Sequence, residues 1–331
     1  MPFIERQITI TITLQARQGA PSKGVAEDAN PTFKDASGAD TGKNTVTING
    51  GGTAAQNGLR ISARVTRPGL PSASTAEVQI YNLSANIANQ ISTLGVPLVY
   101  MVGANLITIA AGDVGSPPTT IFTGTIYNAW RDLKNPPESI FNISAQWGSL
   151  YGSAPAKPLS INGSSPISTI LGNVAPLAGL KLVSLFGSGQ EPVISDLCLS
   201  GTVRDQIRKL VQIAGIDCNI DDVSNTLIIG PKNSSLSLEG QPIPVIGPPP
   251  IGNMVGYPAY TAQGLKVVTE FSTDIRYRSK VQIKGSSIPV ANGEWVVYYM
   301  DYDLECQTEN GPWYTNLEMA NPNYPVLAQP S

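Results

Sequence analysis

Three acidic residues near the end of the chain could do chemistry together: Asp301, Asp303 and Glu305. Their i, i+2, i+4 spacing places all three on one face of a β-strand. Carboxylates arranged in this way could bind a hard cation such as Ca²⁺ or work as an acid–base pair. The spacing does not match an EF-hand, however, and no glycine-containing calcium loop surrounds it. The pattern therefore favours a polar strand face over a metal or catalytic site.

Two further groups of charged residues are candidates for function. Arg204 and Arg208 form an i, i+4 pair on the polar face of a predicted helix, where they could contact a neighbouring protein or simply be solvated. Glu191 and Asp196 are nominal candidates for a cell-wall hydrolase that works with two carboxylates. Neither of these acids lies in a recognisable catalytic motif.

Several chemistries are excluded by the residue types alone. The chain has no histidine, so a Ser-His-Asp triad and a histidine-containing zinc site cannot form within it. The three cysteines, Cys198, Cys218 and Cys306, are too far apart for a CxxC metal knuckle, and we expect free thiols. The triple glycine at 50–52 lacks the Lys-Ser/Thr of a phosphate loop. No cofactor or metal is expected.

The composition indicates a folded chain with fewer charged residues at its surface than usual, so that other means must cover much of this surface. Of 331 residues, 41% are hydrophobic and 14% are charged, against about 25% charged in an average soluble protein. The 32 glycines and 27 prolines disfavour helical bundles. A net charge of −3 gives no large excess of Lys and Arg for binding nucleic acid. One way to cover such a surface is another subunit.

The N-terminus lacks a basic region followed by an apolar run, so no signal peptide is expected. Residues 78–112 contain no charge, but Pro97, Gly103 and Asn105 interrupt the apolar run. A membrane-spanning helix needs about 20 apolar residues in succession. We therefore expect two strands here, at 98–102 and 106–110, and no membrane anchoring.

The first half of the chain has the pattern of β-strands. Ile8 to Leu14 alternates strictly between aliphatic residues and threonine, as in a half-buried strand. Other strands are predicted between turn residues at 60–66, 76–82, 121–128 and 139–146. The segment 18–58 is rich in small polar residues and is expected to be a long loop, or a flexible hairpin around Thr45–Asn49.

The middle of the chain predicts a small α/β domain at 157–238. Ser165-Pro166 is typical of a helix start, and Pro176 should shorten or kink that helix. A second helix follows Thr202, which can cap it, and Gly215 can terminate it. A strand at 180–185 and a hairpin made by 216–220 and 226–230 complete the domain.

After a Pro/Gly-rich, uncharged stretch at 240–264, strand patterns return at 266–271, 280–285, 294–306 and 315–319. The expected organisation is a β domain at 1–156, the α/β domain at 157–238, and a linker with a second β domain at 239–331.

Several segments resemble, in the right order, the phage tail baseplate hub proteins, a family that includes the hubs of contractile-tailed phages and the hub part of type VI secretion spikes. In the first half these are the strand ending Asn82-Leu83-Ser84 and the strand Ile121-Phe122-Thr123-Gly124-Thr125-Ile126. In the second half they are Met254-Val255-Gly256-Tyr257-Pro258, Asn292-Gly293-Glu294-Trp295-Val296-Val297 and Pro312-Trp313-Tyr314-Thr315. Hubs of this kind often carry a histidine after the Asn-Gly strand, whereas this chain has Asp301-Tyr302-Asp303.

The resemblance implies a mainly β fold: two tail-tube-like β-barrel domains plus a small peripheral α/β domain. It implies a structural, non-enzymatic virion protein, a baseplate hub assembled in the host cytoplasm. A homotrimer would adapt the sixfold tail tube to a threefold central spike and form a channel for genomic DNA in transit. Tape measure and baseplate wedge or peripheral proteins would be further partners.

Within that picture Asp301, Asp303 and Glu305 are expected to line the channel, because an acidic wall repels phosphates. No Lys or Arg follows Lys284, while six acidic residues do. Arg204 and Arg208 would contact a partner. The alternatives are a β-rich host-binding adhesin and, less favoured, the hydrolase with Glu191 and Asp196.

Overall fold

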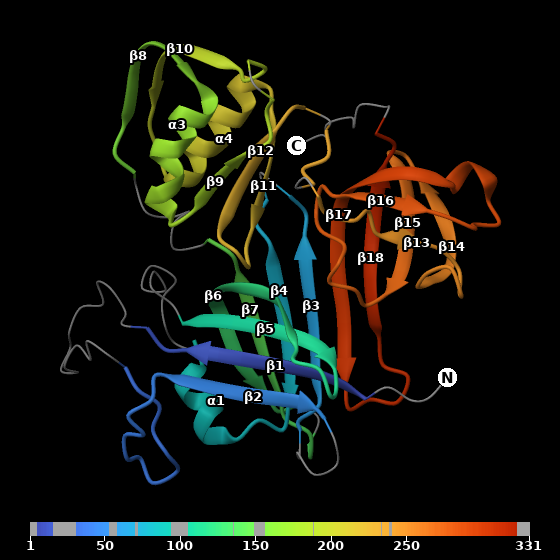
Figure 1. Ribbon diagram of the computed structural model, residues 1–331. Helices are drawn as coiled ribbons and strands as arrows, with labels where there is room; N and C mark the ends of the chain where they lie inside the picture. The colour runs from blue at the N-terminus through green and yellow to red at the C-terminus, as the bar shows by residue number, and fades with distance from the viewer. Residues whose placement is uncertain are drawn as a thin grey trace. The chain divides into compact units, whose positions relative to one another are not determined.

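The chain forms two compact units in a computed structural model (Figure 1). Unit 1 comprises Met1–Thr66, Ser74–Leu150 and Asp303–Trp313; unit 2 comprises Arg67–Ala73, Tyr151–Tyr302 and Tyr314–Ser331. The structure describes residues 5–15, 31–52, 58–69, 72–93, 105–134, 136–148, 156–187, 189–232, 234–237 and 240–322.

The described residues of unit 1 form seven strands and a short helix, together with the end of the later strand that contains residues 303–306. The strands are β1 (Arg6–Thr13), β2 (Thr45–Gly51), β3 (Ile61–Arg67), β4 (Thr75–Tyr81), β5 (Leu106–Asp113), β6 (Thr119–Asp132) and β7 (Ile140–Gln146). Their order in the sheet is β3-β4-β7-β6-β5-β1-β2, with antiparallel neighbours throughout. The predicted strands at 60–66, 76–82, 121–128 and 139–146 are confirmed.

The core of unit 1 follows from the period-2 pattern of β1. Ile8, Ile10 and Ile12 are fully buried, whereas the threonines between them face the other side of the sheet and keep part of their surface exposed. Ile10 lies opposite Ile48 on β2 and Ile109 on β5, so three strands bring aliphatic side chains to one face. Burial of β-branched side chains on one face is the main source of stability for such a sheet.

The sheet of unit 1 closes on itself. Gly50 bridges Leu59, which lies two residues before the start of β3. Leu59 N donates to Asn49 O at 3.0 Å, and Gly51 N donates to Leu59 O at 3.3 Å. A side chain at Gly58 could not fit there, because an added Cβ would lie 1.9 Å from Gly51 O. The bridge covers part of the edge that β2 presents at the end of the sheet order, whereas β3 lies between β4 and β17 (Gly293–Cys306).

This arrangement corrects the expected loop at 18–58. Residues Thr45–Gly51 are not a loop or a hairpin of their own but the strand β2, paired with β1 along its whole length. The small and polar residues of the segment suggested a loop, yet Ile48 is buried in the core. The predicted strand at 98–102 lies outside the described residues, and that at 106–110 is confirmed as part of β5.

A helix in unit 1, α1 (Ala85–Ile91), was not predicted. It begins at Ser84, whose hydroxyl accepts from Ile87 N, and it buries only Ala88 and Ile91. Such a short, weakly patterned helix depends on tertiary packing for its stability.

Unit 2 contains the predicted α/β domain. Its elements are β8 (Leu159–Pro166), α3 (Ile167–Val174), η3 (Ala175–Ala178), β9 (Lys181–Ser184), β10 (Val193–Leu199), α4 (Val203–Ala214), β11 (Asp217–Asp221) and β12 (Thr226–Gly230). The strands form a two-stranded sheet, β10-β8, and a three-stranded sheet, β11-β12-β9, and the helices α3 and α4 pack together (Figure 1).

Both helices end as the sequence predicts. Thr202 and Asp205 form a capping box at the start of α4, and Gly215 terminates α4 with a left-handed φ of 61°. Helix α3 begins after Pro166 and gives way to the 3₁₀ helix η3 at Ala175, beside Pro176, which has no N–H for the α-helical ladder.

The remainder of unit 2 is again antiparallel for the most part. It comprises β13 (Val245–Ile246), β14 (Met254–Thr261), β15 (Gly264–Glu270), β16 (Lys280–Ile283), the turn η4 (Pro289–Ala291), β17 (Gly293–Cys306) and β18 (Trp313–Ala320). The order is β14-β15-β18-β17, with β16 on β17 and β13 on β16. Met254 N at the start of β14 donates to Gly247 O just after β13, at 2.8 Å. The last strand in this order, β13, therefore comes back toward the first, β14.

The fold is therefore mainly β with an α/β insert, as expected. The strands β17 and β18 each divide between the two units, because residues 303–313 belong to unit 1. The domain boundaries at 156 and 238 stay a prediction.

Candidate functional site

The acidic residues Asp301, Asp303 and Glu305 all lie on β17, as predicted, but in different environments. Asp301 is only 4% exposed, and its Oδ2 accepts a hydrogen bond of 2.9 Å from Asn316 Nδ2 on β18. Asp303 is partly exposed. From Tyr302 onward, burial alternates as the sequence indicated, with Tyr302, Leu304 and Cys306 buried. The polar face exists, although Asp301 contributes little accessible charge.

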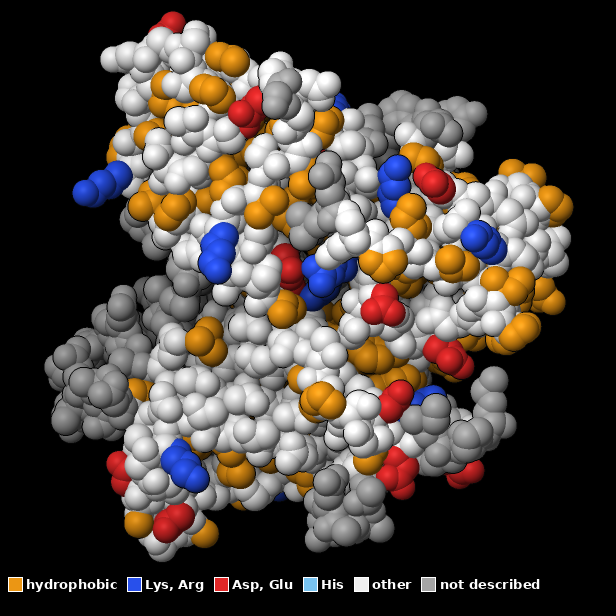
Figure 2. All heavy atoms as spheres, in the orientation of Figure 1, with side chains coloured by type: hydrophobic (Ala, Val, Ile, Leu, Met, Phe, Trp, Pro, Cys, Tyr) orange, Lys and Arg blue, Asp and Glu red, His pale blue; other side chains and the backbone are white. Residues whose placement is uncertain are grey.

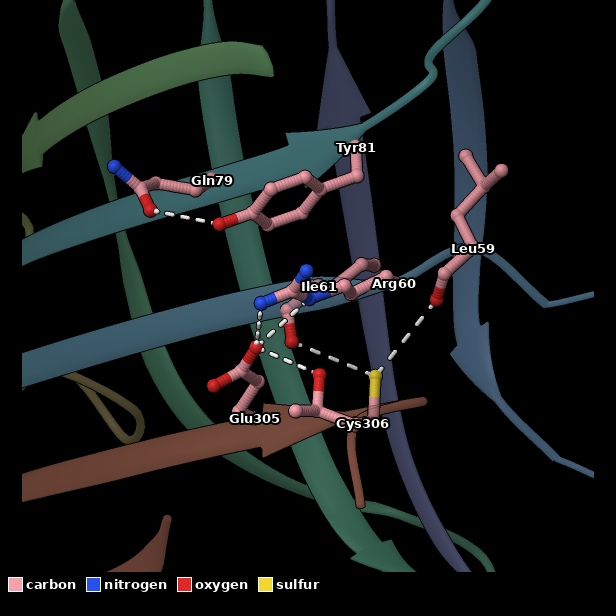
Figure 3. Close-up of polar contacts among 8 residues, drawn as sticks. Leu59, Arg60, Ile61, Gln79, Tyr81, Glu305 and Cys306 are labelled. Carbon is pink, nitrogen blue, oxygen red and sulfur yellow. Dashed lines mark hydrogen bonds and ion pairs between the residues drawn. The ribbon is translucent and has the colours of Figure 1, made fainter. Parts of the chain in front are cut away.

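Glu305 is held in an ion pair that the sequence did not suggest (Figure 3). Its Oε1 lies 2.8 Å from Arg60 Nη2 and 2.9 Å from Arg60 Nε, and it also accepts from Thr308 Oγ1 at 2.7 Å. The Arg60 guanidinium carbon lies 4.2 Å from the centre of the Tyr81 ring, a cation–π arrangement. The hydrogen bond to Glu305 raises the pKa of Arg60 above its ordinary value.

The neighbouring Cys306 shows no sign of reactivity. Its Sγ donates weakly to Ile61 O at 3.6 Å and Leu59 O at 3.8 Å (Figure 3). Burial raises the pKa of Cys306 to about 11 and that of Cys218 to about 12, which keeps both thiols protonated at neutral pH. All three cysteines are free, as expected.

The basic pair on α4 lies at the surface of the α/β domain. Arg208 is exposed and pairs with Asp205 at 3.1 Å, one turn earlier on the same helix. Arg204 is partly exposed. An exposed pair of this kind contributes at most about 1 kcal/mol to stability. The structure thus leaves Arg208 accessible to a partner.

The two hydrolase candidates each bind backbone. Glu191 Oε1 accepts from Ser168 N at the start of α3, at 2.9 Å. Asp196 Oδ1 accepts from Gly163 N on β8, also at 2.9 Å. Both carboxylates therefore have a local structural role. Among the residues that the structure describes, no group of three or more Cys, Asp and Glu could hold a metal ion, and no helix is long and apolar enough to cross a membrane.

Sequence reasoning missed two ion pairs within unit 2. Arg67, at the end of β3, lies 2.8 Å from Asp222 in the turn between β11 and β12, and Arg278 pairs with Asp217 at the start of β11. Burial raises the pKa of Asp222 to about 6, although the positive charge of Arg67 works in the opposite direction. Since Arg67 and Asp222 are 155 residues apart, no local pattern could have predicted their contact.

The fold and these contacts define a structural β-protein in which the charged residues mostly fix strands and loops in place. Among known protein families, the one described as Baseplate hub gp41 matches residues 43–318 of this chain. The chain belongs to this family, and the resemblance seen in its strand motifs is confirmed. It is a structural protein of the phage tail baseplate, which places it in the virion.

Solved structures share the fold at low sequence identity. A tail protein from Neisseria meningitidis MC58 is 10% identical with a TM-score of 0.53, and the match covers 80% of this chain and 97% of that one. The 43 kDa tail protein of prophage MuSo2 from Shewanella oneidensis gives the same identity and TM-score, with 81% and 95% covered. A chain of the Francisella PdpA–VgrG complex is also 10% identical, with a TM-score of 0.51 and coverage of 98% and 59%. No curated protein sequence matches.

Proposed function

We propose that this protein is a trimeric hub that adapts a sixfold tail tube to a threefold central spike. The observation that carries the proposal is that each unit contains a set of strands that returns toward its own beginning, at Gly50 and Leu59 in unit 1 and at Gly247 and Met254 in unit 2. Three chains would then present six barrels to the tube and three copies of every other surface to the spike.

The same ring would enclose a channel for genomic DNA. The polar face of β17 is our candidate for its wall, with Asp303 partly exposed, the Glu305 side chain 13% exposed and Asp301 buried. A negative wall repels DNA phosphates, so the genome could slide without binding. Arg60 neutralises part of this charge at Glu305.

Partners follow from the same arrangement. The tail tube protein and the tape measure protein would lie on the tube side, and the spike protein on the opposite side. The α/β domain would face baseplate wedge or peripheral proteins through Arg204 and Arg208 on α4. We propose that the protein catalyses no reaction and is not anchored in a membrane, and that it assembles in the host cytoplasm.

Native mass spectrometry of the purified chain, alone and with the spike protein of the same phage, tests the proposal. Trimers of the 34.9 kDa chain are expected, either alone or on addition of the spike. A chain that stays monomeric under both conditions, and that instead binds glycans or cleaves cell wall, would favour the adhesin or the hydrolase and overturn the hub proposal.

A further inference from the structure

A small cavity in unit 2 combines charged, hydroxyl and apolar side chains. Its volume is about 210 Å³, and all of its lining residues belong to unit 2. Arg276, Lys280 and Asp274 supply its charges, serine hydroxyls lie between them, and Pro242 and Ile243 form an apolar wall. Sites for drug-sized ligands have about 300–1,000 Å³, so this cavity has room only for a smaller group, such as the end of a peptide.

Three charged side chains at one cavity are exceptional for this chain. Only 14% of its residues are charged. On the face of the molecule that Figure 2 shows, the charged side chains of the described residues are few and lie scattered among neutral ones. A polar cavity in such a surface is a candidate for recognition of a ligand.

The cavity lies beside a break in the backbone ladder along β16. Gln282 N donates to Pro244 O, and the parallel register continues from Val245. A further ladder bond would run from the N–H of residue 244 to Lys280 O, but proline has no N–H. Lys280 N donates instead to Ser237 Oγ, at 3.0 Å. The ladder therefore ends at Pro244, and residues on both sides of the break line the cavity.

Arg276 is held in place by its neighbours, while its own guanidinium has no partner. Tyr277 packs so closely on Gly69 that no side chain would fit there, and Arg278 pairs with Asp217. Arg276 is exposed, and its guanidinium forms no hydrogen bond or ion pair with any residue that the structure describes. Because the turn is already fixed, a ligand pays less entropy to bind this side chain. A guanidinium binds a carboxylate through two parallel hydrogen bonds.

The other charges at the cavity favour the end of a peptide over a simple anion. Lys280 is a second cation, loosely held, because its Nζ lies 3.7 Å from Glu294 Oε2. Asp274 is exposed, and its carboxylate accepts no hydrogen bond from the described part of the chain. Asp274 would repel a phosphate, whereas a peptide end brings a carboxylate for the cations and an N–H for Asp274.

We propose that this cavity binds the C-terminal end of a partner polypeptide. Arg276, supported by Lys280, binds the terminal carboxylate, and Asp274 accepts a hydrogen bond from a backbone N–H of the same peptide end. Ile243, which is 43% exposed, covers an aliphatic last side chain. Capture of a chain end through its carboxylate is a recurring mode of peptide recognition. The site needs no second copy of the chain, because one unit supplies all of its residues.

The blocked tripeptide acetyl-Ala-Ala-Val tests the site, as the free acid and as the C-terminal amide. Peptide-observed NMR with the purified chain gives the dissociation constant from the broadening of the valine methyl signals. The free acid should bind at least about 10-fold more tightly than the amide, because hydrogen bonds between charged groups are stronger. Sodium acetate should bind at least about 10-fold more weakly than the free acid, since it has no N–H for Asp274 and no side chain for Ile243.

Two substitutions of arginine show whether the cavity is the binding site. Arg276→Gln should weaken binding of the free acid at least about 10-fold and leave binding of the amide unchanged. Arg208→Gln makes the same chemical change on α4, outside the cavity, and should bind the free acid like the wild type. Thermal unfolding should show both variants folded.

Equal binding of the free acid and the amide, or of the free acid by Arg276→Gln and the wild type, would overturn the chain-end site. Acetate binding as tight as that of the tripeptide would also overturn it and indicate a general anion site, and so would a wild-type chain that binds no tripeptide at millimolar concentration. These results would leave the trimeric hub intact, because one chain forms the cavity. A chain that binds the free acid as expected but never forms trimers would overturn the hub alone.

Discussion

At the scale of single residues, the acidic strand that first suggested chemistry turns out to be a set of individually bound carboxylates. Asn316 binds Asp301, and Arg60 and Thr308 bind Glu305. A carboxylate that accepts hydrogen bonds from neighbouring side chains in this way is held in place, which suits a supporting or wall-forming role better than proton transfer.

Glu305→Gln should lower the free energy of unfolding by about 1 kcal/mol, because it removes the charge that pairs with Arg60 while preserving the shape of the side chain. The expected loss in the free energy of unfolding is small, since the Arg60 side chain is partly exposed to water. Urea denaturation measures the change. Glu309→Gln, in the exposed turn after β17, is the control and should stay within about 0.5 kcal/mol of wild type. Equal stability of the two variants would contradict a stabilising Arg60–Glu305 pair.

Asp222 predicts a pH dependence of stability. Burial raises the pKa of Asp222 to about 6, well above its ordinary value of 3.8. A raised pKa means that the folded chain binds this proton more tightly than the unfolded chain does. The corresponding stability is fully present below pH 3.8 and is lost as the pH rises through about 6.

Asp222→Asn should therefore flatten the fall in stability between pH 4 and pH 7, as measured by urea denaturation at several pH values. The comparison concerns the slope and not the absolute stability, because the substitution also leaves Arg67 without its anionic partner. Asp274→Asn, at an exposed position in the same unit, is the control and should keep the wild-type slope. An unchanged slope in Asp222→Asn would show that Asp222 has an ordinary pKa.

At the scale of elements, the closure of unit 1 depends on backbone approaching backbone. The bridge between Gly50 and Leu59 is possible because Gly58 and Gly51 have no side chains at the point of contact. The glycines at 50–52 do not form a phosphate loop. Their role is structural, because the strand must pass close to its neighbours.

Gly58→Ala should destabilise the chain by at least about 2 kcal/mol or prevent folding, because its Cβ would lie 1.9 Å from Gly51 O and the backbone would have to move. Gly172→Ala makes the same chemical change in helix α3, where the nearest atom is 4.0 Å away. That control should be neutral or stabilising by up to about 1 kcal/mol, since alanine favours helix. Similar stability for both variants in thermal unfolding would argue against the closure.

At the scale of the whole molecule, charge is unevenly distributed along the chain. Residues 151–331 carry eleven basic and fifteen acidic residues, whereas the first 150 are nearly balanced with ten and nine. The excess of acid at the C-terminal end coincides with β17 and β18, the strands that contribute to both units. This coincidence is the reason to look for the channel wall there.

Asp303→Lys should slow DNA ejection several-fold in phage particles, because a cation on the wall would attract the passing phosphates. Ejection can be followed by the fluorescence of a DNA-binding dye after triggering. Asp303→Asn is the matched control and should change the rate little. Particle yield, counted by electron microscopy, should be the same for both. An unchanged rate in Asp303→Lys at normal yield would remove Asp303 from the wall.

The sequence by itself determined the class of fold and most of its elements. Period-2 alternation predicted β1, and the Thr202 and Gly215 signals predicted both ends of α4, because these patterns depend on neighbours only a few residues apart. Ordered strand motifs were enough to indicate the family. Helix α1 and the strands β2, β8 and β10 were missed, and the stretch at 240–264 that was taken as a linker contains β13 and β14. Their local patterns are weak, and they are fixed by packing or pairing with other strands.

Only the tertiary structure decided what the charged residues do. Arg60 and Glu305 are separated by 245 residues, and Arg67 and Asp222 by 155, so their pairing follows from how the strands are ordered and not from any spacing in the chain. The same holds for the place of β14 at the end of the sheet order, which became visible only when its sheet neighbours were known. Short sequence patterns predict helices and strands because sterics and burial act between residues that are close in the chain. The charged surfaces depend on contacts between distant residues, which are determined only by the whole fold.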